Sequence, residues 1–204
     1  MLKSLRKYIL AAFIMLTAVF TASAQAMTVT YTELGVPNID SSFKSYMDYG
    51  CITAENSPQY KYLDKWCWID YDGFVRCNAE KELGITSDYY AVAMGSYYGT
   101  EIGTKYRVTT DTGNVFYCVL VDCKDNSDTN CTNQYGTDNY DILEFIVNTY
   151  QYKINENGRE NKQYLYNSEN VLINTMVSQF GSANVYMPLN GKIVSVEKIT
   201  FSEV

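Results

Sequence analysis

The sequence predicts a mainly β fold with two or three short peripheral helices. The chain has 204 residues, of which 20 are tyrosine and three are proline, and tyrosine is enriched in strands. Several short segments alternate apolar and polar residues, as half-buried strands do. Glycine-containing turns such as Asp72-Gly73 separate these segments. A chain of this length is enough for one domain with a substantial core.

The first 26 residues are typical of a secretory signal peptide. Three basic residues precede the apolar run at 8–20, and the small residues of ASAQA follow it. A membrane anchor is the alternative, but a span needs about 20 apolar residues. We therefore expect cleavage near residue 26, a secreted protein with no stable membrane anchor, and a single domain over 27–204 with helical and loop additions at both ends.

The charge of this mature chain excludes one class of partner. Removing residues 1–26 takes away three of the 16 basic residues and none of the 23 acidic ones, which leaves a net charge of −10. Phosphate backbones and anionic lipid headgroups repel such a protein. We expect no nucleic-acid partner.

The first elements are expected to be a short helix and a hairpin. Phe43, Tyr46 and Met47 have helical spacing after capping residues, which predicts a helix over 41–49. The segment 51–60 is expected to be a turn. WCWIDYDGFVRC predicts a hairpin, and a three-residue loop at 71–73 with a left-handed glycine places Cys67 opposite Cys77. A two-residue loop would place Cys67 opposite Asn78 instead.

The remaining elements follow from alternation and from turn residues. A polar loop at 123–139 is long enough to be functional or disordered, and 151–167 is expected to be an insertion or a mobile loop. A helix is expected over 169–181, after Ser168 as cap. Strands are expected within 88–94, 104–111, 115–122, 140–148 and 191–201.

Six cysteines in a secreted chain predict disulfides. The hairpin register pairs Cys67 with Cys77. Cys123 and Cys131 bracket a short polar loop and form the next pair, which leaves Cys51 for Cys118. A zinc site made of cysteines alone is the alternative, although the spacings match no standard zinc motif. We expect no metal and no cofactor.

The absence of histidine limits the chemistry that is available. Without an imidazole there is no Ser-His-Asp or Cys-His nucleophilic pair and no HExxH zinc site. If the protein is an enzyme, carboxylates are expected to transfer the protons.

Asp122 and Asp141 interrupt two runs of strand-forming residues, VLVDC and YDILEFIV. Burying an ionised carboxylate costs several kcal/mol or more unless it is paired or hydrogen-bonded. In one interpretation the two aspartates face one cleft as a catalytic pair. In the other, Asp122 caps the loop that it begins, and Asp141 starts a strand beside an Asx turn. Strand alternation places Glu144 on the face opposite Asp141.

The order AVAMGSYYGTEIGTKYRVTTDTGNVFYCVLVDC, then a polar loop, then YDILEFIV, resembles secreted double-psi β-barrel domains. These are the rare lipoprotein A, expansin and barwin, and 3D-domain families. The matching positions are Gly103-Thr104, Val108, Asp122 and Asp141, within residues 89–147. The resemblance implies a small closed barrel and, as in the lytic members, an aspartate that cleaves the glycan strands of bacterial peptidoglycan. Cys123-Lys124 replaces the Arg-Gly of these families.

Two functions of different class follow. The first is a cell-wall or polysaccharide-directed barrel that cleaves glycan with Asp122 and Asp141. The second is a non-catalytic carbohydrate- or protein-binding module. Acidic loop residues could bind calcium, although they match no EF-hand pattern and a solvated loop is favoured. The binding residues that we expect are Tyr97, Tyr98, Thr104, Lys124 and Glu144.

Overall fold

The computed structural model describes residues 27–70, 72–148, 151–154, 160–163 and 182–203. The signal segment 1–26 and the helix expected over 169–181 lie outside these residues. The chain divides into a large unit, Val29–Thr200, and a small one. In the small unit the structure describes 27–28 and 201–203, and the hydroxyls of Thr28 and Ser202 lie 2.8 Å apart. The description below concerns the large unit.

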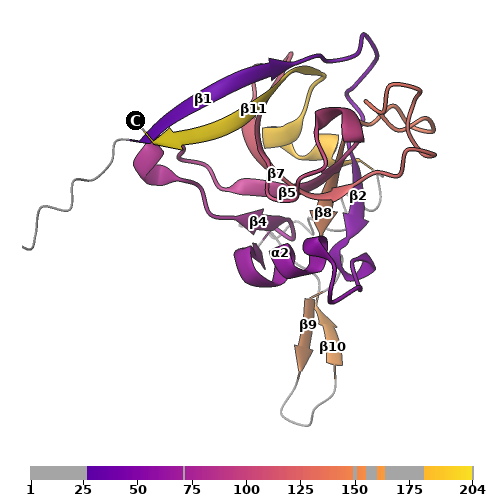
Figure 1. The fold of residues 1–204 in the computed structure, drawn as a ribbon. Helices are drawn as coiled ribbons and strands as arrows, with labels where there is room; N and C mark the ends of the chain where they lie inside the picture. Colours follow the sequence, from indigo (N-terminus) through magenta and orange to yellow (C-terminus); the bar gives the residue numbers. More distant parts are fainter. Residues whose placement is uncertain (1–26, 71, 149–150, 155–159, 164–181, 204) are drawn as a thin grey trace, which may run out of the picture. The chain divides into compact units, whose positions relative to one another are not determined.

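The described residues are mainly β, as the sequence predicts (Figure 1). The helical elements are α2 (Pro58–Trp66) and five 3₁₀ turns, η1 (Tyr49–Cys51), η2 (Lys81–Leu83), η3 (Ser96–Tyr98), η4 (Ala183–Val185) and η5 (Met187–Leu189). The strands are β1 (Met27–Leu34), β2 (Ser45–Asp48), β3 (Cys67–Ile69), β4 (Val75–Cys77), β5 (Tyr89–Met94), β6 (Lys105–Thr110), β7 (Val115–Cys123), β8 (Leu143–Val147), β9 (Gln151–Ile154), β10 (Glu160–Gln163) and β11 (Ile193–Glu203).

Nine of the described strands form one sheet in the order β1-β11-β6-β7-β5-β4-β3, with β8 joining β5 to β2. Strands β4 and β8 share one edge of β5, at Tyr89–Tyr90 and Val92–Met94 respectively. Strands β5 and β7 run parallel, as do β2 and β8. Strands β9 and β10 form a separate hairpin inside the segment expected to be an insertion or loop.

The sheet is not closed into a barrel, so the closed barrel expected from the sequence is not confirmed. A side chain, rather than a ladder of backbone bonds, joins the chain before β2 to β11. The Ser41 hydroxyl accepts from the backbone N–H of Ile193 at 2.9 Å and donates to the carbonyl of the same residue at 3.0 Å. In a closed barrel a ladder of backbone hydrogen bonds would join two such segments, whereas here the Ser41 side chain makes the connection.

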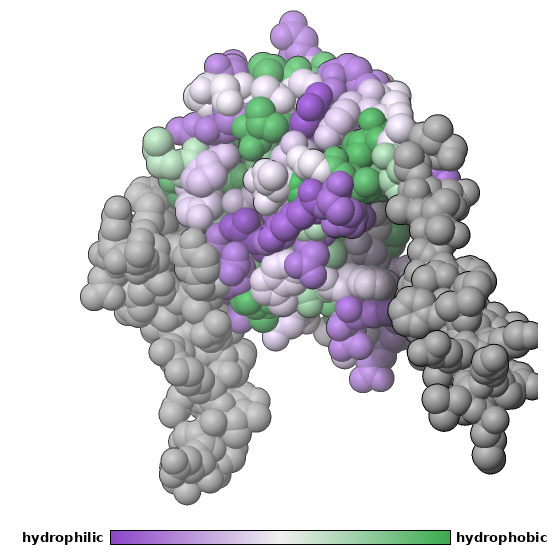
Figure 2. Space-filling view, turned by 90° about the vertical axis from the view of Figure 1, so that its left-hand side faces the viewer, coloured by the Kyte–Doolittle hydropathy of each residue, from purple (hydrophilic) through white to green (hydrophobic). Residues whose placement is uncertain are grey.

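The core lies against the central strands β5, β7 and β8. Phe74, Tyr90, Phe116 and Phe145 pack there, mostly edge to face, with ring centroids 5.3 to 6.2 Å apart. Such aromatic pairs contribute about 0.5–1.5 kcal/mol each beyond the area they bury. On the face shown in Figure 2, hydrophilic and hydrophobic residues are interspersed.

The helix expected over 41–49 is wrong. Residues 45–48 form β2, which pairs in parallel with β8 from Ser45↔Glu144 to Asp48↔Val147. Long-range pairing overrides the local helical spacing here. The helix of this region is α2, in which Ser57 caps Tyr60 N–H at 3.1 Å and Pro58 occupies the first turn. Ser-Pro is a helix-start signal inside the segment expected to be a turn.

The hairpin register is confirmed, because Cys67 lies directly opposite Cys77. Gly73 adopts φ 87°. The Asp70 N–H donates to the Phe74 carbonyl at 2.9 Å and the Gly73 N–H donates to the Asp70 carbonyl at 3.0 Å, which closes the loop. All six cysteines are unbonded in the structure. The three disulfides therefore stay predictions, and the structure leaves Cys51 exposed while Cys118 is fully buried.

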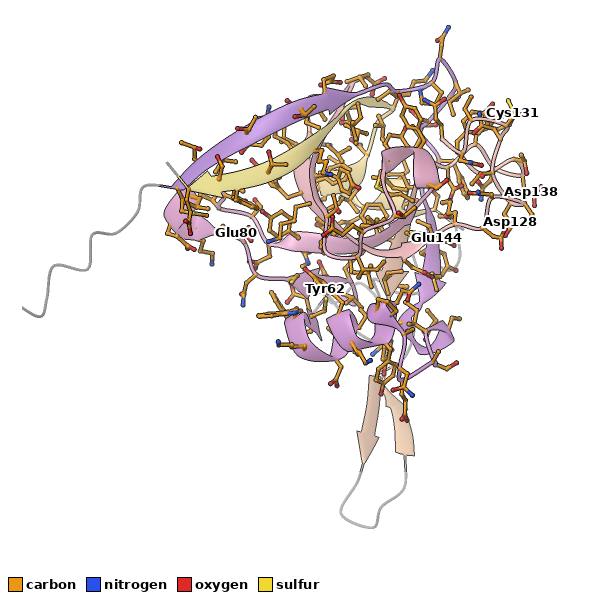
Figure 3. All side chains as sticks on the ribbon, in the orientation of Figure 1. Tyr62, Glu80, Asp128, Cys131, Asp138 and Glu144 are labelled. Carbon is orange, nitrogen blue, oxygen red and sulfur yellow. The ribbon has the colours of Figure 1, made fainter. Side chains whose placement is uncertain are left out.

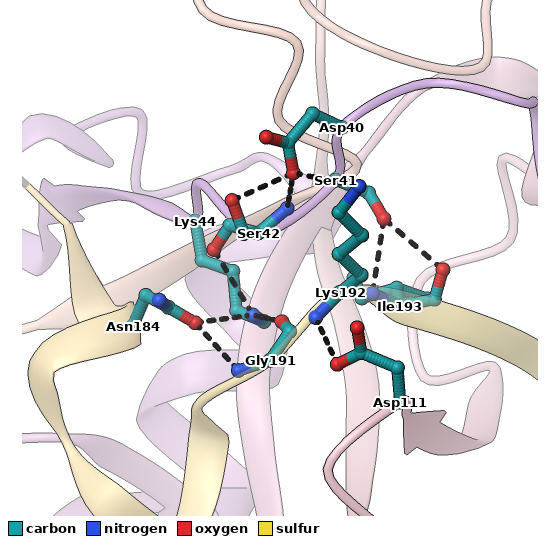
Figure 4. Close-up of polar contacts among 9 residues, drawn as sticks. All are labelled: Asp40, Ser41, Ser42, Lys44, Asp111, Asn184, Gly191, Lys192 and Ile193. Atoms are coloured by element: carbon teal, nitrogen blue, oxygen red, sulfur yellow. Dashed lines mark hydrogen bonds and ion pairs between the residues drawn. The ribbon is translucent and has the colours of Figure 1, made fainter.

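Lys44 is fully buried beside β2, without a carboxylate within ion-pair distance among the described residues (Figure 4). Its Nζ donates to the carbonyls of Ser42 and Gly191 and to Asn184 Oδ1 at 2.6 to 3.2 Å. Burial lowers the pKa of Lys44 to about 8, while Asp111 opposes this shift. This lysine ties the chain before β2 to the chain before β11.

Among the described residues, no helix has the length and apolarity that a membrane crossing requires.

Candidate functional site

A row of residues crosses four neighbouring strands at one level. Asp122 on β7 pairs with Ala93 on β5, and Ala93 pairs with Glu144 on β8. Glu144 in turn pairs with Ser45 on β2. The small side chain of Ala93, which is 2% exposed, therefore lies between two carboxylates.

A β-bulge turns Asp122 away from the core. The register of β5 and β7 shifts between Val92↔Leu120 and Ala93↔Asp122, so β7 carries one extra residue at this point. Val92 and Leu120 belong to the core cluster, whereas Ala93 and Asp122 do not. Without the extra residue, alternation would place Asp122 on the core side with Leu120. The bulge is the reason that a charged residue can end this buried strand.

Above this row lies a hollow of about 360 Å³, which we call the carboxylate hollow. Six acidic side chains surround it, together with Lys124 and a few small or polar residues. Figure 3 shows Asp128, Asp138 and Glu144 on the same side of the structure. The lining residues are Ser45, Ala93, Asp122, Cys123, Lys124, Asp125, Asp128, Gly136, Asp138, Asn139, Asp141 and Glu144.

Asp141 is anchored at the wall of this hollow. Its side chain is 1% exposed, and its Oδ2 lies 2.6 Å from Lys124 Nζ. The Ser45 hydroxyl donates to the same oxygen. Removing one partner of such a buried ion pair strongly destabilises the protein, because the other charge then stays buried without its partner. Lys124 and Ser45 therefore fix the position of the Asp141 side chain at the wall of the hollow.

The second oxygen of Asp141 has no hydrogen-bond partner. Oδ1 is buried, and a Cβ placed on Gly136 would press against it. A buried polar atom without a partner costs about 1–3 kcal/mol. No donor for this oxygen lies among the described residues, and the atom itself is not exposed to the hollow.

Glu144 is the candidate proton donor. Burial raises the pKa of its carboxyl above the usual value of 4.5; Lys124 opposes this, and the carboxylates of Asp141 and Asp122 add to it. A carboxyl whose pKa is raised stays protonated to higher pH and can act as a general acid.

The expectation that Glu144 lies on the face opposite Asp141 is wrong. Both line the carboxylate hollow. Alternation applies only within a strand, and Asp141 precedes β8, in a turn where Tyr140 has φ 60°. Because Asp141 and Ile142 lie outside the strand, alternation does not relate the direction of the Asp141 side chain to that of Glu144.

No protein family, curated protein or solved structure matches this chain. The chemistry of the site must therefore be argued from its own geometry.

Both structural roles proposed for the aspartates are also present. Asp122 Oδ1 accepts from the Cys123 N–H at 2.9 Å and from Gln59 Nε2 at 3.2 Å. Asn139 Oδ1 accepts from the Asp141 N–H at 3.0 Å, as in an Asx turn. These contacts hold the Asp122 side chain and the chain at Asp141 in place.

The structure brings Asp122, Asp141, Lys124 and Glu144 together, and it places the other expected binding residues elsewhere. Tyr98 is buried in the core cluster, where its ring packs edge to face with that of Tyr97. Tyr97 is exposed on η3, and Thr104 lies in the turn before β6, hydrogen-bonded to the Glu101 carbonyl. These three do not line the hollow.

Sequence reasoning missed Ser45, Ala93 and Gln59. Ser45 and Gln59 fall in segments whose structure was expected to be different, and the Ser57-Pro58 start signal could have placed Gln59 on a helix. Ala93 had a signal of its own, because a small residue in the buried strand YYAVAM leaves room on one face. In the part of the chain that the structure describes, no cluster of His, Cys, Asp or Glu could hold a metal ion.

Proposed function

We propose that this protein binds a polysaccharide strand in the carboxylate hollow and cleaves a glycosidic bond there. Glu144 is the general acid and Asp122 is the second carboxylate. The observation that carries the proposal is that both residues pair with Ala93 from opposite sides. This pair replaces the Asp122 and Asp141 pair expected from the sequence.

The spacing of the two carboxylates suits cleavage with inversion. Two strand spacings separate their backbones by roughly 10 Å, and their side chains stand on the same side of the sheet above Ala93. Inverting glycosidases separate their carboxyls by about 6.5–9.5 Å, with a water on the far side of the sugar. Glu144 would protonate the leaving oxygen, and Asp122 would take a proton from the attacking water.

Asp141 and Lys124 would orient the sugar without exchanging protons. Both residues line the hollow, and Lys124 Nζ, 2.6 Å from Asp141 Oδ2, can donate to a sugar hydroxyl there. Tyr140 directly precedes Asp141 and is half exposed. Its ring centroid lies 5.8 Å from that of Tyr135. Its exposed ring can pack against the C–H face of a pyranose.

We further propose that the sheet is an open variant of the double-psi barrel. The support is the combination of two parallel pairs, β5 with β7 and β2 with β8, joined by the antiparallel pair of β5 and β8. The signal-like segment 1–26 supports secretion, so the proposed ligand is a cell-wall or other extracellular glycan.

The alternative is a non-catalytic carbohydrate- or protein-binding module on the same surface. It is favoured by the contacts of Asp122 with Cys123 and Gln59, since an aspartate with two partners can be a loop cap and no more.

The deciding experiment is incubation of the purified protein with peptidoglycan and with neutral polysaccharides, followed by analysis of released fragments. We expect release by the wild type, and at least a 10²-fold loss in Glu144→Gln and in Asp122→Asn, the usual effect of removing a general acid or base. Glu82→Gln, an exposed acid on η2, is the matched control and should keep full activity.

Sedimentation with the insoluble glycan separates the two functions. Binding by the wild type without any release of fragments would support the binding module and contradict cleavage. Neither binding nor release on any glycan would contradict both.

A further inference from the structure

A second hollow lies between α2 and the β3–β4 hairpin, and we call it the aromatic hollow. Its volume is about 490 Å³ and most of its lining is apolar. The lining residues are Tyr49, Gly50, Ile52, Thr53, Glu55, Tyr60, Leu63, Asp64, Cys67, Trp68, Ile69 and Val75. It shares no residue with the carboxylate hollow.

The Cys67 and Cys77 thiols lie on the side of the hairpin that faces this hollow. The register pairs Cys67 with Cys77 and Ile69 with Val75, and residues two apart on a strand point to the same face. Cys67, Ile69 and Val75 line the hollow, whereas Cys77 does not and is 6% exposed. The two sulfurs therefore differ in access.

The surroundings of Cys77 favour its thiolate. The thiol of Cys67 hydrogen-bonds to the Cys77 sulfur and, as the largest cause, lowers the pKa of Cys77 to about 7; burial opposes this, and Tyr62 and Lys105 add to it. The Tyr62 hydroxyl lies 3.9 Å from the Cys77 sulfur, and Figure 3 shows Tyr62 on the side of α2 that faces the sheet. The contributions of Tyr62 and Lys105 do not depend on the state of Cys67.

We propose that Cys67 and Cys77 form a redox site, whose disulfide a small thiol opens by entering the aromatic hollow and attacking Cys67. The incoming thiolate bonds to the Cys67 sulfur, the bond between Cys67 and Cys77 breaks, and Cys77 leaves as a thiolate. A second small thiol then displaces Cys67. The net change is two small thiols and one protein disulfide giving one small disulfide and the two protein thiols.

The access to the two sulfur atoms and the pKa of the departing thiol both favour attack at Cys67. Thiol–disulfide exchange is faster at an accessible sulfur, and faster when the departing thiol has a low pKa. Attack at Cys67 meets the first condition and attack at Cys77 does not, because Cys67 lines the hollow whereas Cys77 is 6% exposed. The hydroxyl of Tyr62 and the charge of Lys105 lower the pKa of Cys77, so Cys77 also meets the second condition when it departs. The inference stands independently of the proposed glycan chemistry.

The test uses the full chain, oxidised with oxidised glutathione and then treated with reduced glutathione without denaturant. Acid quenching, alkylation and peptide mapping locate the adduct. We expect glutathione on Cys67 while Cys77 is alkylated. The Cys77→Ser variant should keep an adduct at Cys67, and Cys67→Ser should take none at Cys77 until the protein unfolds.

Filling the hollow tests the route of entry. Leu63→Trp should slow opening at least tenfold, whereas Lys61→Trp, exposed on the same helix, should not. If Leu63→Trp does not fold, Ile69→Phe serves in its place. An adduct on Cys77, failure of the pair to form a disulfide, or equal rates in the blocked and control variants would each overturn the proposal.

Discussion

Protonation of Glu144 sets the pH range in which the proposed cleavage can occur. Burial raises the pKa of this carboxyl above 4.5, and a general acid works only while it is protonated. We expect kcat/KM to fall as pH rises through the Glu144 pKa. A pH–rate profile should show this limb in the wild type, and Glu144→Gln should lose it along with the activity.

The Glu82→Gln control should keep the limb unchanged. A wild-type profile that is flat across the acid range would contradict the role of Glu144.

The buried Lys44 makes the free energy of unfolding depend on pH in the alkaline range. Its pKa is lowered from 10.5 to about 8 by burial, so the unfolded chain binds the proton more tightly. The cost of burying the charge is fully present below pH 8 and disappears as pH rises toward 10.5. From pH 8 to pH 9.5 this one group should add about 1.5 kcal/mol of stability.

The measurement is urea unfolding at both pH values for the wild type and Lys44→Met. The variant should be less stable throughout, because three acceptors lose their donor, and its stability should lack the added rise. The half-exposed Lys192→Met is the control. An identical pH dependence in Lys44→Met and the wild type would show that Lys44 does not titrate in this range.

At the scale of elements, helix α2 carries both its N-cap, Ser57, and a residue that contacts the candidate site, Gln59. Ser57 caps the helix, and Gln59 in its first turn contacts Asp122. Ser57→Ala should cost about 1 kcal/mol of unfolding free energy in urea, whereas Ser57→Asp should cost little, since Asp caps as well as Ser. Equal losses in both variants would mean that the hydroxyl has another role.

The bulged pair of β5 and β7 makes the floor of the carboxylate hollow. Ala93→Leu would project into the space between Asp122 and Glu144, at an overpacking cost of about 1–3 kcal/mol. We expect glycan binding to be lost while the far-ultraviolet circular dichroism is kept. Ala93→Gly should still bind, and undiminished binding by Ala93→Leu would place the ligand elsewhere.

Elements governed by local pattern could be predicted from the sequence. Strands β5 to β8 and β11 lie in the segments where strands were expected, β6 with strictly alternating burial, and the hairpin register follows from the glycine at 73. Strand β2 could not be predicted, because its partner β8 is distant in sequence and the local spacing is helical. The position of Glu144 relative to Asp141 was missed because β8 begins only at Leu143, so Asp141 is not part of the strand to which alternation applies.

For the whole molecule, charge should decide which glycans bind. A chain of net charge −7 with six carboxylates around one hollow repels polyanions, and salt screens this repulsion beyond about 10 Å at 0.1 M. Binding to a neutral polysaccharide should change little with salt. Binding to a polyuronate should be weak at low salt and should strengthen as salt is added, measured by sedimentation with each glycan.

A polyuronate that binds more tightly at low salt than the neutral glycan would contradict this reading of the charge.

The parallel pairing of β2 with β8 has a consequence for how the protein folds. The ladder joins residue 45 to residue 144, so nearly a hundred residues of chain must be closed into a loop before it forms. Such contacts slow folding, because the entropy of loop closure is lost before the contact repays it. As the chain leaves a ribosome or a secretion pore, Ser45 emerges long before its partner. The row that carries Ser45, Glu144, Ala93 and Asp122 can therefore be completed only after β8 is available, and a chain interrupted before residue 143 would lack it.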